Sequence, residues 1–130
     1  MIIDSSALVA IVLKEADFMR YIERISEATS KRMSAASLLE TSIIVNRAKG
    51  SAGVEILRRF LSEAGVQVVA FDEGQARLAF EAHLRFGKGM GHPAQLNILD
   101  CCTYALAAEL GEPVLFKGAD FGVTDLSTVE

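Results

Sequence analysis

The sequence predicts an α/β fold in which a central, mainly parallel sheet is flanked by helices on both faces. Two observations predict it. Short apolar segments alternate along the chain with amphipathic stretches of about 10 to 15 residues, the pattern of strands joined by helical crossovers. No linker or repeat interrupts the 130 residues, so residues 1–130 are expected to form a single domain with one continuous core.

The first predicted strand is residues 1–4, MIID, and a helix follows it directly. Ser5 or Ser6 is the expected N-cap of this helix, which continues through Leu13. Asp17 is a second candidate N-cap. The helix after it is predicted from apolar residues at i, i+3, i+4 and i+7, namely Phe18, Tyr21, Ile22 and Ile25.

Two helical segments are predicted in the middle of the chain. Ser37 is the expected cap of the first, which reaches about Lys49 and ends at Gly50. Residues 53–64 resume the helical period, and Gly65 supplies the stop. The remaining strands and the last turn are predicted from short segments, which are KRMSAAS, VQVVAF, PVLF and the turn KGAD.

Asp72 can cap a further helix, which runs to about Phe86. The segment RFGKGMGHPAQLN contains three glycines and a proline, so a long exposed loop is expected there. The last helix contains Asp100 in its first turn and stops at Gly111.

The composition is that of a compact globular protein. Hydrophobic residues make up 51% of the chain and charged residues 23%, with only two prolines. The large apolar share suggests that a partner covers part of the surface. The formal net charge of -4 argues against binding of nucleic acid through overall charge, although it leaves room for a local basic rim or a metal-bridged substrate.

The opening segment MIIDSSALVAIVLKE has no basic region and contains Asp4, which argues against a signal peptide. No apolar run reaches about 18 residues, so no membrane span is expected and the protein is expected to be cytoplasmic. Cys101 and Cys102 are adjacent, which excludes the CxxC spacing of a zinc site and favours buried, reduced thiols.

Four carboxylates occupy comparable places in this layout. Asp4 and Asp120 follow strands, and Glu40 and Asp100 lie in the first turns of helices. In a parallel sheet these positions share one edge, so the four acids are expected to converge on one cleft. Because like charges repel, such a cluster is stable mainly with cations, and hard divalent ions such as Mg²⁺ or Mn²⁺ fit oxygen ligands.

The chemistry expected of this cluster is metal-assisted attack of water on a phosphodiester, with two ions suited to an in-line displacement. The alternative is that each acid is only a helix cap or a partner of a helix dipole. Asp100 fits that alternative less well, because its neighbours Leu99 and Cys101 are apolar.

Five segments carry a resemblance that covers nearly the whole chain. They are MIIDSSAL, AASLLE, FGKGMGHPAQLN, DCCTYALA and LFKGADFGVTD. Together they resemble the PIN-domain toxins of the VapC family. The occurrence of FGKG followed by LFKGxDFxxTD is specific to that resemblance. The resemblance implies a three-layer PIN-like fold and a Mg²⁺- or Mn²⁺-dependent ribonuclease that inhibits translation by cleaving tRNA, rRNA or mRNA. It also implies a VapB-type antitoxin as partner and a homodimer or a larger toxin–antitoxin complex.

The resemblance also assigns the site residues. It implies that Asp4, Glu40, Asp100 and Asp120 are the catalytic and metal-binding acids, with Asp4 and Asp100 matching the metal-binding pair most directly. Ser6 matches a small hydroxyl residue that hydrogen-bonds a metal-bound water or a carboxylate, although a serine there can equally be a helix cap.

Asp125 matches the trailing TD of the family and is expected to be either an acid behind the metal ligands or a turn former. Two residues depart from the family pattern. Leu99 stands where glycine is common, so its branched side chain could shift the Asp100 carboxylate or narrow access to it, and Ala119 stands where a polar residue is common.

Other signals are weaker. The segment FGKGMG lacks the earlier glycine and the following hydroxyl of a phosphate-binding loop, which argues against nucleotide hydrolysis. Lys88 and Arg85 could contact phosphates near the cleft or be solvated charges. Structural or surface roles are favoured for His83 and His92, which have no partner at ligand spacing.

Two basic pairs, Lys31-Arg32 and Arg58-Arg59, could touch RNA, although such pairs are commonly exposed ends of helices or strands. Two other functional classes remain. The first is a PIN-scaffold binding module that acts mainly through its antitoxin complex. The second is a phosphoryl-transfer receiver domain with Lys117 in its active site, which is disfavoured because no acid pair precedes Asp4.

Overall fold

The four predicted strands form one parallel sheet in the computed structural model, which describes all residues from 1 to 130. The strands are β1 (Ile2–Ile3), β2 (Arg32–Ser34), β3 (Gln67–Val69) and β4 (Val114–Leu115). They lie in the order β3-β2-β1-β4, and every neighbouring pair is parallel. The predicted α/β class with a parallel sheet is therefore confirmed.

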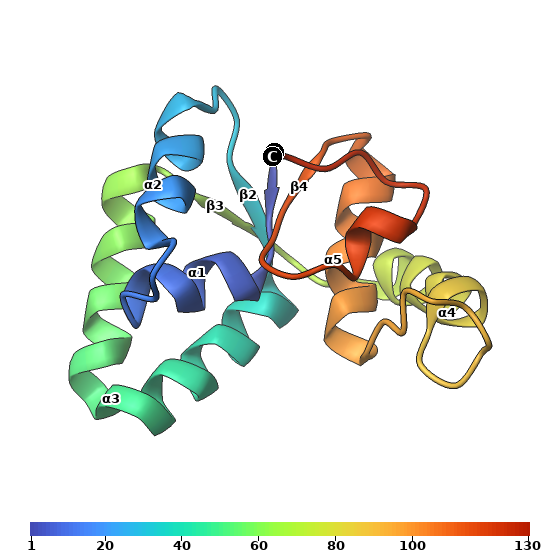
Figure 1. The fold of residues 1–130 in the computed structure, drawn as a ribbon, viewed down its shortest axis with the longest axis horizontal. Helices are drawn as coiled ribbons and strands as arrows, with labels where there is room; N and C mark the ends of the chain where they lie inside the picture. Colours follow the sequence, from blue (N-terminus) through green and yellow to red (C-terminus); the bar gives the residue numbers. More distant parts are fainter.

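Helices cover both faces of the sheet. They are α1 (Ser5–Val12), α2 (Phe18–Glu27), α3 (Ala35–Ala64), α4 (Glu73–Phe86) and α5 (Ile98–Leu110), followed by the short 3-10 helix η1 (Phe121–Val123). Figure 1 shows α1, α2 and α3 on one side of the strands and α4 and α5 on the other. The molecule thus has three layers, and none of its helices is both long and apolar enough to cross a membrane.

The core has one half on each side of the sheet. Adjacent residues of β1 point to opposite faces, so Ile3 packs with α1, α2 and α3, whereas Ile2 packs with α4 and α5. Both side chains are fully buried. A strand buried on both faces is what helical crossovers on both sides of a parallel sheet produce.

Helix α3 begins earlier than the sequence indicated. Ser34, the last residue of β2, is its N-cap and accepts a hydrogen bond from the Ala36 amide at 3.2 Å. The prediction of Ser37 as the cap was wrong, because pairing with β3 ends the strand at Ser34 and the chain turns directly into the helix. Glu40 consequently lies in the second turn of α3 and not in the first.

A kink divides α3 where a helix end was predicted. Gly50 has φ 65° and ψ −156°, a conformation that glycine adopts without steric cost, and the helix resumes immediately after it. The second half ends at Gly65, which is left-handed with φ 71°. Both glycine stops were therefore correctly placed, although the two helical halves follow each other with less separation than expected.

The other helix caps show one confirmed prediction and one error. Asp72 caps α4 by accepting a hydrogen bond from the Gln75 amide at 2.9 Å, as predicted. Helix α1 is capped by Asp4, so the prediction of Ser5 or Ser6 as its cap was wrong. Asp17 precedes α2 but makes no capping hydrogen bond with its side chain.

The segment between α4 and α5 is better anchored than a simple exposed loop. Gly87 forms a bridge with Leu96, and Leu96 and Ala94 are fully buried. His92 Nδ1 accepts a hydrogen bond from the Ala94 amide at 3.0 Å, which is the kind of structural role that the sequence favoured for this histidine. The segment therefore delivers the chain to the start of α5 in a defined position.

Candidate active site

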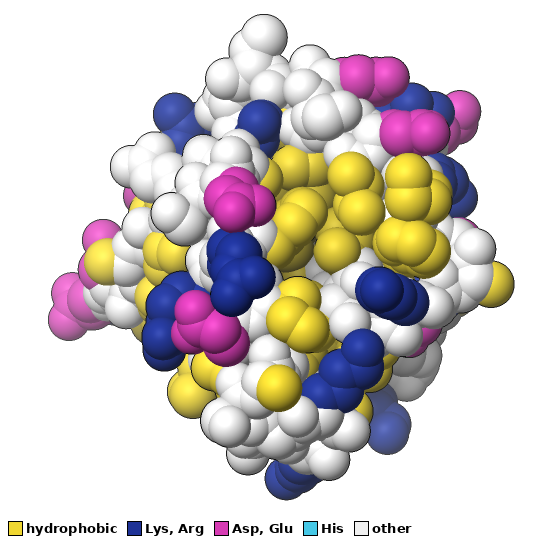
Figure 2. Space-filling model, turned by 90° about the vertical axis from the view of Figure 1, so that its left-hand side faces the viewer, with side chains coloured by type: hydrophobic (Ala, Val, Ile, Leu, Met, Phe, Trp, Pro, Cys, Tyr) yellow, Lys and Arg dark blue, Asp and Glu magenta, His cyan; other side chains and the backbone are white.

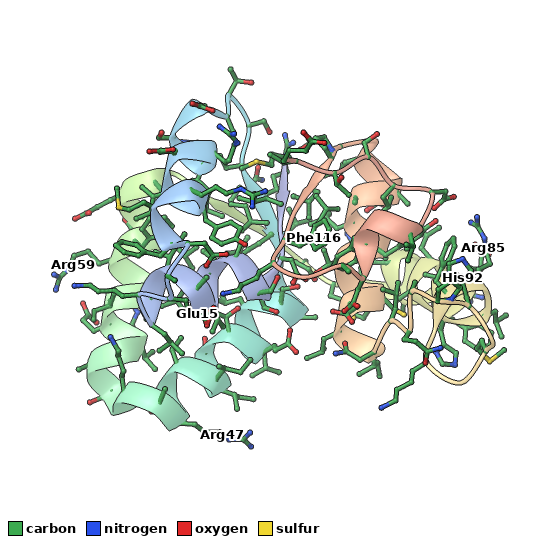
Figure 3. The ribbon with its side chains drawn as sticks, in the orientation of Figure 1. Glu15, Arg47, Arg59, Arg85, His92 and Phe116 are labelled. Atoms are coloured by element: carbon green, nitrogen blue, oxygen red, sulfur yellow. The ribbon has the colours of Figure 1, made fainter.

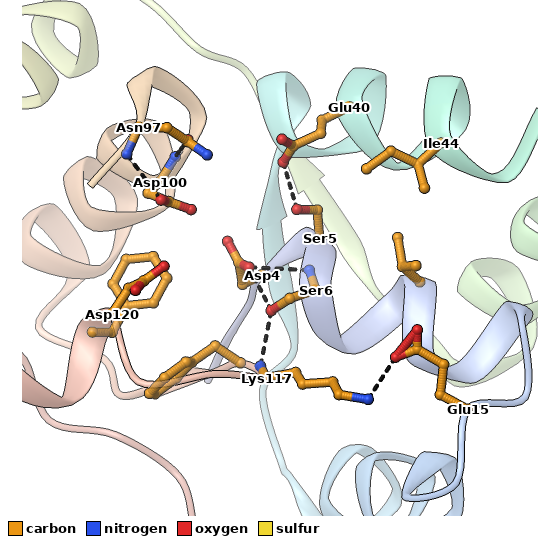
Figure 4. A pocket seen from close by; sticks show the side chains of 13 residues that line it. Asp4, Ser5, Ser6, Glu15, Glu40, Ile44, Asn97, Asp100, Lys117 and Asp120 are labelled. Atoms are coloured by element: carbon orange, nitrogen blue, oxygen red, sulfur yellow. Dashed lines mark hydrogen bonds and ion pairs between the residues drawn. The ribbon is translucent and has the colours of Figure 1, made fainter. Parts of the chain in front are cut away.

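The four predicted acids converge on one cleft. Its volume is about 320 Å³, and it is lined by residues from α1, α3, the start of α5 and the segment after β4. The acids among them are Asp4, Glu15, Glu40, Asp100 and Asp120. Figure 4 shows the carboxylates of Asp4, Glu40, Asp100 and Asp120 arranged around the cleft, as the common edge of parallel strands and following helices requires.

Asp4 is the most deeply buried of these acids, with 4% of its surface exposed. Its Oδ1 accepts a hydrogen bond from the Thr103 hydroxyl at 2.7 Å. Its Oδ2 accepts from the Ser6 amide at 3.0 Å and from the Ser6 hydroxyl at 2.7 Å. Asp4 is therefore a helix cap and a member of the acidic cluster at once, and Ser6 supports its carboxylate.

Asp100 also has two roles. It forms a capping box with Asn97, in which Asp100 Oδ2 accepts from the Asn97 amide at 3.0 Å and Asn97 Oδ1 accepts from the Asp100 amide at 2.8 Å. Burial raises the pKa of Asp100 to about 6, and the nearby carboxylates of Asp4, Asp120 and Glu40 add to the rise. A carboxylate that served only as a solvated cap would lack this crowding by like charges.

Glu40 is held by a residue whose role the sequence did not reveal. The Ser5 hydroxyl donates a hydrogen bond to Glu40 Oε1 at 2.5 Å. Burial raises the pKa of Glu40 above its usual range and the charge of Asp4 adds to the rise, while the Ser5 hydrogen bond opposes it. The serine pair directly after Asp4 was the available signal, but Ser5 was interpreted only as a possible helix cap.

Asp120 reaches the cleft from the turn between β4 and η1. It is exposed, and its side chain makes no capping hydrogen bond to η1. Its carboxylate is close enough to raise the pKa of Asp100. The structure thus places Asp120 with the other three acids and assigns it no separate structural contact.

Asp125 does not line the cleft. It accepts hydrogen bonds from the Tyr104 hydroxyl at 2.6 Å and from Arg85 Nη2 at 2.9 Å. The Tyr104 hydrogen bond lowers the pKa of Asp125, and Arg85 lowers it further. These contacts tie the C-terminal segment to α4 and α5.

The basic residues considered for phosphate binding lie elsewhere. Figure 3 shows Arg85 at the outer end of the α4 layer, away from Glu15 at the cleft. Lys88 lines a different pocket. Lys117 is the one cation that lines the acidic cleft, where its ammonium pairs with Glu15 at 2.6 Å and with Asp17 at 3.1 Å.

The two basic pairs are partly occupied by structural contacts. Lys31 donates to the Ala64 carbonyl at 2.9 Å and Arg32 pairs with Glu112, which leaves neither free to form a basic rim. Arg58 pairs with Glu55 at 3.1 Å on the surface.

Leu99 lines the second pocket and not the acidic cleft, so its side chain does not narrow access to Asp100. That pocket is apolar, has a volume of about 770 Å³ and is lined in part by Cys101 and Cys102. Both cysteines are buried free thiols, and burial raises the pKa of Cys101 to about 11.

The donor set of the cleft suits a hard divalent cation. No three carboxylate, imidazole or thiol groups lie close enough to hold an ion by themselves. Mg²⁺ does not require that, because it keeps several waters and binds through one or two carboxylates together with substrate phosphates. Asp4 Oδ1, which accepts one hydrogen bond, and Asp100 Oδ1, which accepts none from the protein, fit this mode of binding, with Glu40 and Asp120 beside them.

Known sequences match this chain over nearly its whole length. A family model described as "PIN domain" matches residues 1–126. VapC ribonuclease Mb0625 from Mycobacterium bovis is 44% identical over 124 residues, which cover 95% of this chain and 93% of that protein. Ribonuclease VapC from Mycolicibacterium smegmatis is 43% identical over 129 residues, which cover 99% of both.

Solved structures share the fold at low sequence identity. The crystal structure of VapC20 from Mycobacterium tuberculosis, described as a sarcin-ricin loop cleaving toxin, superposes with a TM-score of 0.82 at 17% identity and covers 99% of this chain and 98% of that one. VapBC2 from Rickettsia felis, bound to a DNA fragment from its promoter, gives a TM-score of 0.77 at 14% identity, with 98% and 96% covered. With the acids in place and relatives matched over nearly their whole length, the chain belongs to the PIN-domain family and, within it, to the VapC ribonucleases.

Proposed function

We propose that this protein is a Mg²⁺- or Mn²⁺-dependent endoribonuclease toxin that hydrolyses RNA phosphodiester bonds in the cytoplasm and thereby inhibits translation. The observation that carries the proposal is the convergence of Asp4, Glu40, Asp100 and Asp120 on one cleft. Burial raises the pKa of Asp100 to about 6, and the charges of the neighbouring carboxylates add to the rise. The relatives named as VapC ribonucleases support RNA as the substrate.

Each acid has a role in this proposal. Asp4 and Asp100 bind the cation directly, and Glu40 and Asp120 complete the negative cluster around it. When bound, the cation lowers the pKa of a water molecule and neutralises charge on the phosphate that is attacked. Glu40 has an Oε2 that accepts no hydrogen bond from the protein and a raised pKa, so this oxygen is suited to accept a proton from the attacking water.

The experiment is RNA cleavage by the purified protein with Mg²⁺, with Mn²⁺ and with a chelator, beside Asp100→Asn. We expect cleavage only with a divalent ion and little cleavage by the variant. Cleavage that persists in the chelator, or that the variant performs as well as the wild type, would remove the catalytic assignment. The alternative, a PIN scaffold that acts mainly through its antitoxin complex, is not favoured because the complete set of acids is present in one cleft.

We propose a VapB-type antitoxin as the protein partner. Structures of similar fold include VapBC2 and a toxin-antitoxin complex from Klebsiella pneumoniae. Figure 2 shows a broad apolar patch with both basic and acidic side chains around it, on the face where α1, α2 and the second half of α3 lie in Figure 1. Co-expression with a VapB-type antitoxin tests the partner, and a complex that protects RNA from cleavage is the expected result.

We also propose that the protein is a homodimer, alone or within a larger toxin–antitoxin complex. Large apolar side chains are exposed beside the apolar pocket between α4 and α5, with 79% of Ile98 and 62% of Phe80 accessible. On α3, Leu39 and Ile43 are also exposed. Light scattering of the wild type beside Ile98→Asp tests the proposal, which expects a dimer for the first and a monomer for the second.

A further inference from the structure

A buried hydroxyl on α5 contacts the acid on which the proposed metal site depends. Thr103 is fully buried, and its Oγ1 donates to Asp4 Oδ1 at 2.7 Å. On its other side, Thr103 Oγ1 lies 3.0 Å from the hydroxyl oxygen of Ser37, which is 1% exposed. These polar groups lie in the interior between α3, α5 and the end of β1. Because they are buried there, their hydrogen-bond partners come from the protein.

The direction of this chain of hydrogen bonds follows from the number of protons available. A carboxylate only accepts, so the single hydroxyl proton of Thr103 goes to Asp4. Ser37 must then donate to Thr103. The sequence of donors is therefore Ser37, Thr103 and Asp4, and each member depends on the one before it.

The hydrogen bonds also distinguish the two oxygens of Asp4. Oδ2 accepts from both the amide and the hydroxyl of Ser6, which occupies its two lone pairs. Oδ1 accepts from Thr103 alone. Oδ1 is therefore the oxygen of Asp4 that has a lone pair left for a cation, and Thr103 fixes the direction in which that lone pair points.

The same hydrogen bonds connect all the elements that carry the acids. Thr103 lies one helical turn after Asp100 on α5, and Ser37 lies one turn before Glu40 on α3. On the other side of Asp4, the Ser6 hydroxyl accepts a hydrogen bond from the Lys117 amide at 2.8 Å, shortly before Asp120. One network thus sets the positions of four acids that come from distant parts of the sequence.

We propose that Thr103 is a positioning residue of the metal site, which orients Asp4 Oδ1 and, with Ser37 behind it, holds α5 and α3 at the spacing that the cation requires. This inference rests on the proposed metal-dependent function. Loss of the hydroxyl leaves the buried Oδ1 without its donor, so the direction of Oδ1 is no longer fixed, although Oδ2 stays bound to Ser6. Supporting residues of this kind typically contribute about 10- to 100-fold to metal affinity.

The chain offers a matched control. Thr41 is also fully buried on α3, and its hydroxyl donates to the Ser37 carbonyl at 2.7 Å without contacting an acid. Thr103→Val and Thr41→Val therefore remove the same group from equally buried positions. Thr103→Ser keeps the hydroxyl and tests rescue.

The experiment measures the Mn²⁺ dissociation constant by isothermal titration calorimetry, the metal-free Tm and RNA cleavage as a function of Mn²⁺. We expect Thr103→Val to weaken Mn²⁺ binding about tenfold, Thr103→Ser to restore most of it, and Thr41→Val to leave it unchanged at a similar loss of Tm. Saturating Mn²⁺ should recover most of the cleavage rate of Thr103→Val. If Thr103→Val does not fold, Ser37→Ala takes its place with a weakening of a few-fold.

The outcomes separate the inference from the function on which it rests. If the wild type binds Mn²⁺ and Thr103→Val, or Ser37→Ala in its place, binds it equally well, the inference is wrong and the proposed function stands. An equal weakening in Thr41→Val also overturns it, because burial alone would then explain the effect. If the wild type binds no Mn²⁺ and cleaves no RNA, the proposed function fails and the inference fails with it.

Discussion

Asp120 and Asp125 lie close together after β4 but in opposite electrostatic surroundings. Asp125 is paired with Arg85 and Tyr104, and these partners lower its pKa. Asp120 lies beside other carboxylates and contributes to the raised pKa of Asp100. The fold neutralises one acid with its own residues and leaves the other in a group of like charges.

This difference separates structural acids from functional ones. A carboxylate with its own cationic partner needs nothing further, whereas a cluster without one is stabilised by an external cation. The single cation that lines the cleft, Lys117, is already paired with Glu15 and Asp17. The comparison therefore supports the proposed metal site in the cleft and indicates a structural role for Asp125.

The largest expected effect is on catalysis. Asp4→Asn keeps the size of the side chain but removes the charge at the centre of the cleft, so RNA cleavage should fall by more than about 100-fold, beyond what the loss of a supporting residue typically costs. Asp125→Asn, the matched change in the paired acid, should retain most of the activity. Comparable losses of cleavage in the two variants would break the distinction between them.

The dependence of stability on pH should differ in sign between the two acids. Folded Asp100 keeps its proton up to about pH 6, whereas the unfolded chain releases it near 3.8, so the free energy of unfolding should fall as pH rises through this window without metal. Asp125 has a lowered pKa, so its contribution is present above the unfolded value and is lost as the pH falls below it.

Urea unfolding between pH 3 and 7 in a chelator measures both effects. Asp100→Asn should flatten the decrease in stability between about pH 4 and 6, and Mn²⁺ should reverse it by binding the ionised form. An unchanged profile in Asp100→Asn would mean that neither the burial of Asp100 nor the nearby carboxylates affect the stability of the fold.

A smaller effect is expected at the paired acid. Tyr104→Phe removes the hydroxyl that donates to Asp125 but leaves the Arg85 ion pair, so stability should fall by about 1 kcal/mol. Mn²⁺ affinity should stay at the wild-type value, since Tyr104 does not line the cleft. Chemical unfolding and calorimetry on the same sample check the two parts, and a marked loss of Mn²⁺ binding would show that the two regions are coupled.

The smallest effect is expected for Lys117→Ala. Its ion pairs with Glu15 and Asp17 are partly exposed to solvent, and pairs at the surface add little to stability. The Tm should therefore remain within error of the wild type, as measured by differential scanning calorimetry. A large loss of Tm would show that the fold depends on the pairing of Glu15 and Asp17 with Lys117.

Much of the fold and the positions of the four acids could be predicted from the sequence. The alternation of strands and helices places the residues after parallel strands on one edge, and this alone predicts that Asp4 and Asp120 meet Asp100. The cap of α3 was misassigned because Ser34 and Ser37 are both good caps, and the choice depends on where pairing with β3 ends the strand.

The supporting contacts could not be predicted because they join residues far apart in the sequence. Thr103 reaches Asp4, and Ser5 reaches Glu40, only after helices from both layers pack against the sheet. The role of Asp125 also could not be predicted from the sequence alone. Its place in a motif left two roles open, and only its contacts with Tyr104 and Arg85 show that it ties the C-terminal segment to α4 and α5.

The most direct test of the central claim is Mn²⁺ binding to the purified, RNA-free protein by isothermal titration calorimetry, with Asp100→Asn and Asp125→Asn as a pair. We expect Mn²⁺ to bind to the wild type and, with near-wild-type affinity, to Asp125→Asn, whereas binding to Asp100→Asn should be lost or strongly weakened. The claim would be contradicted by a wild type that binds no Mn²⁺, or by binding that depends on Asp125 and not on Asp100.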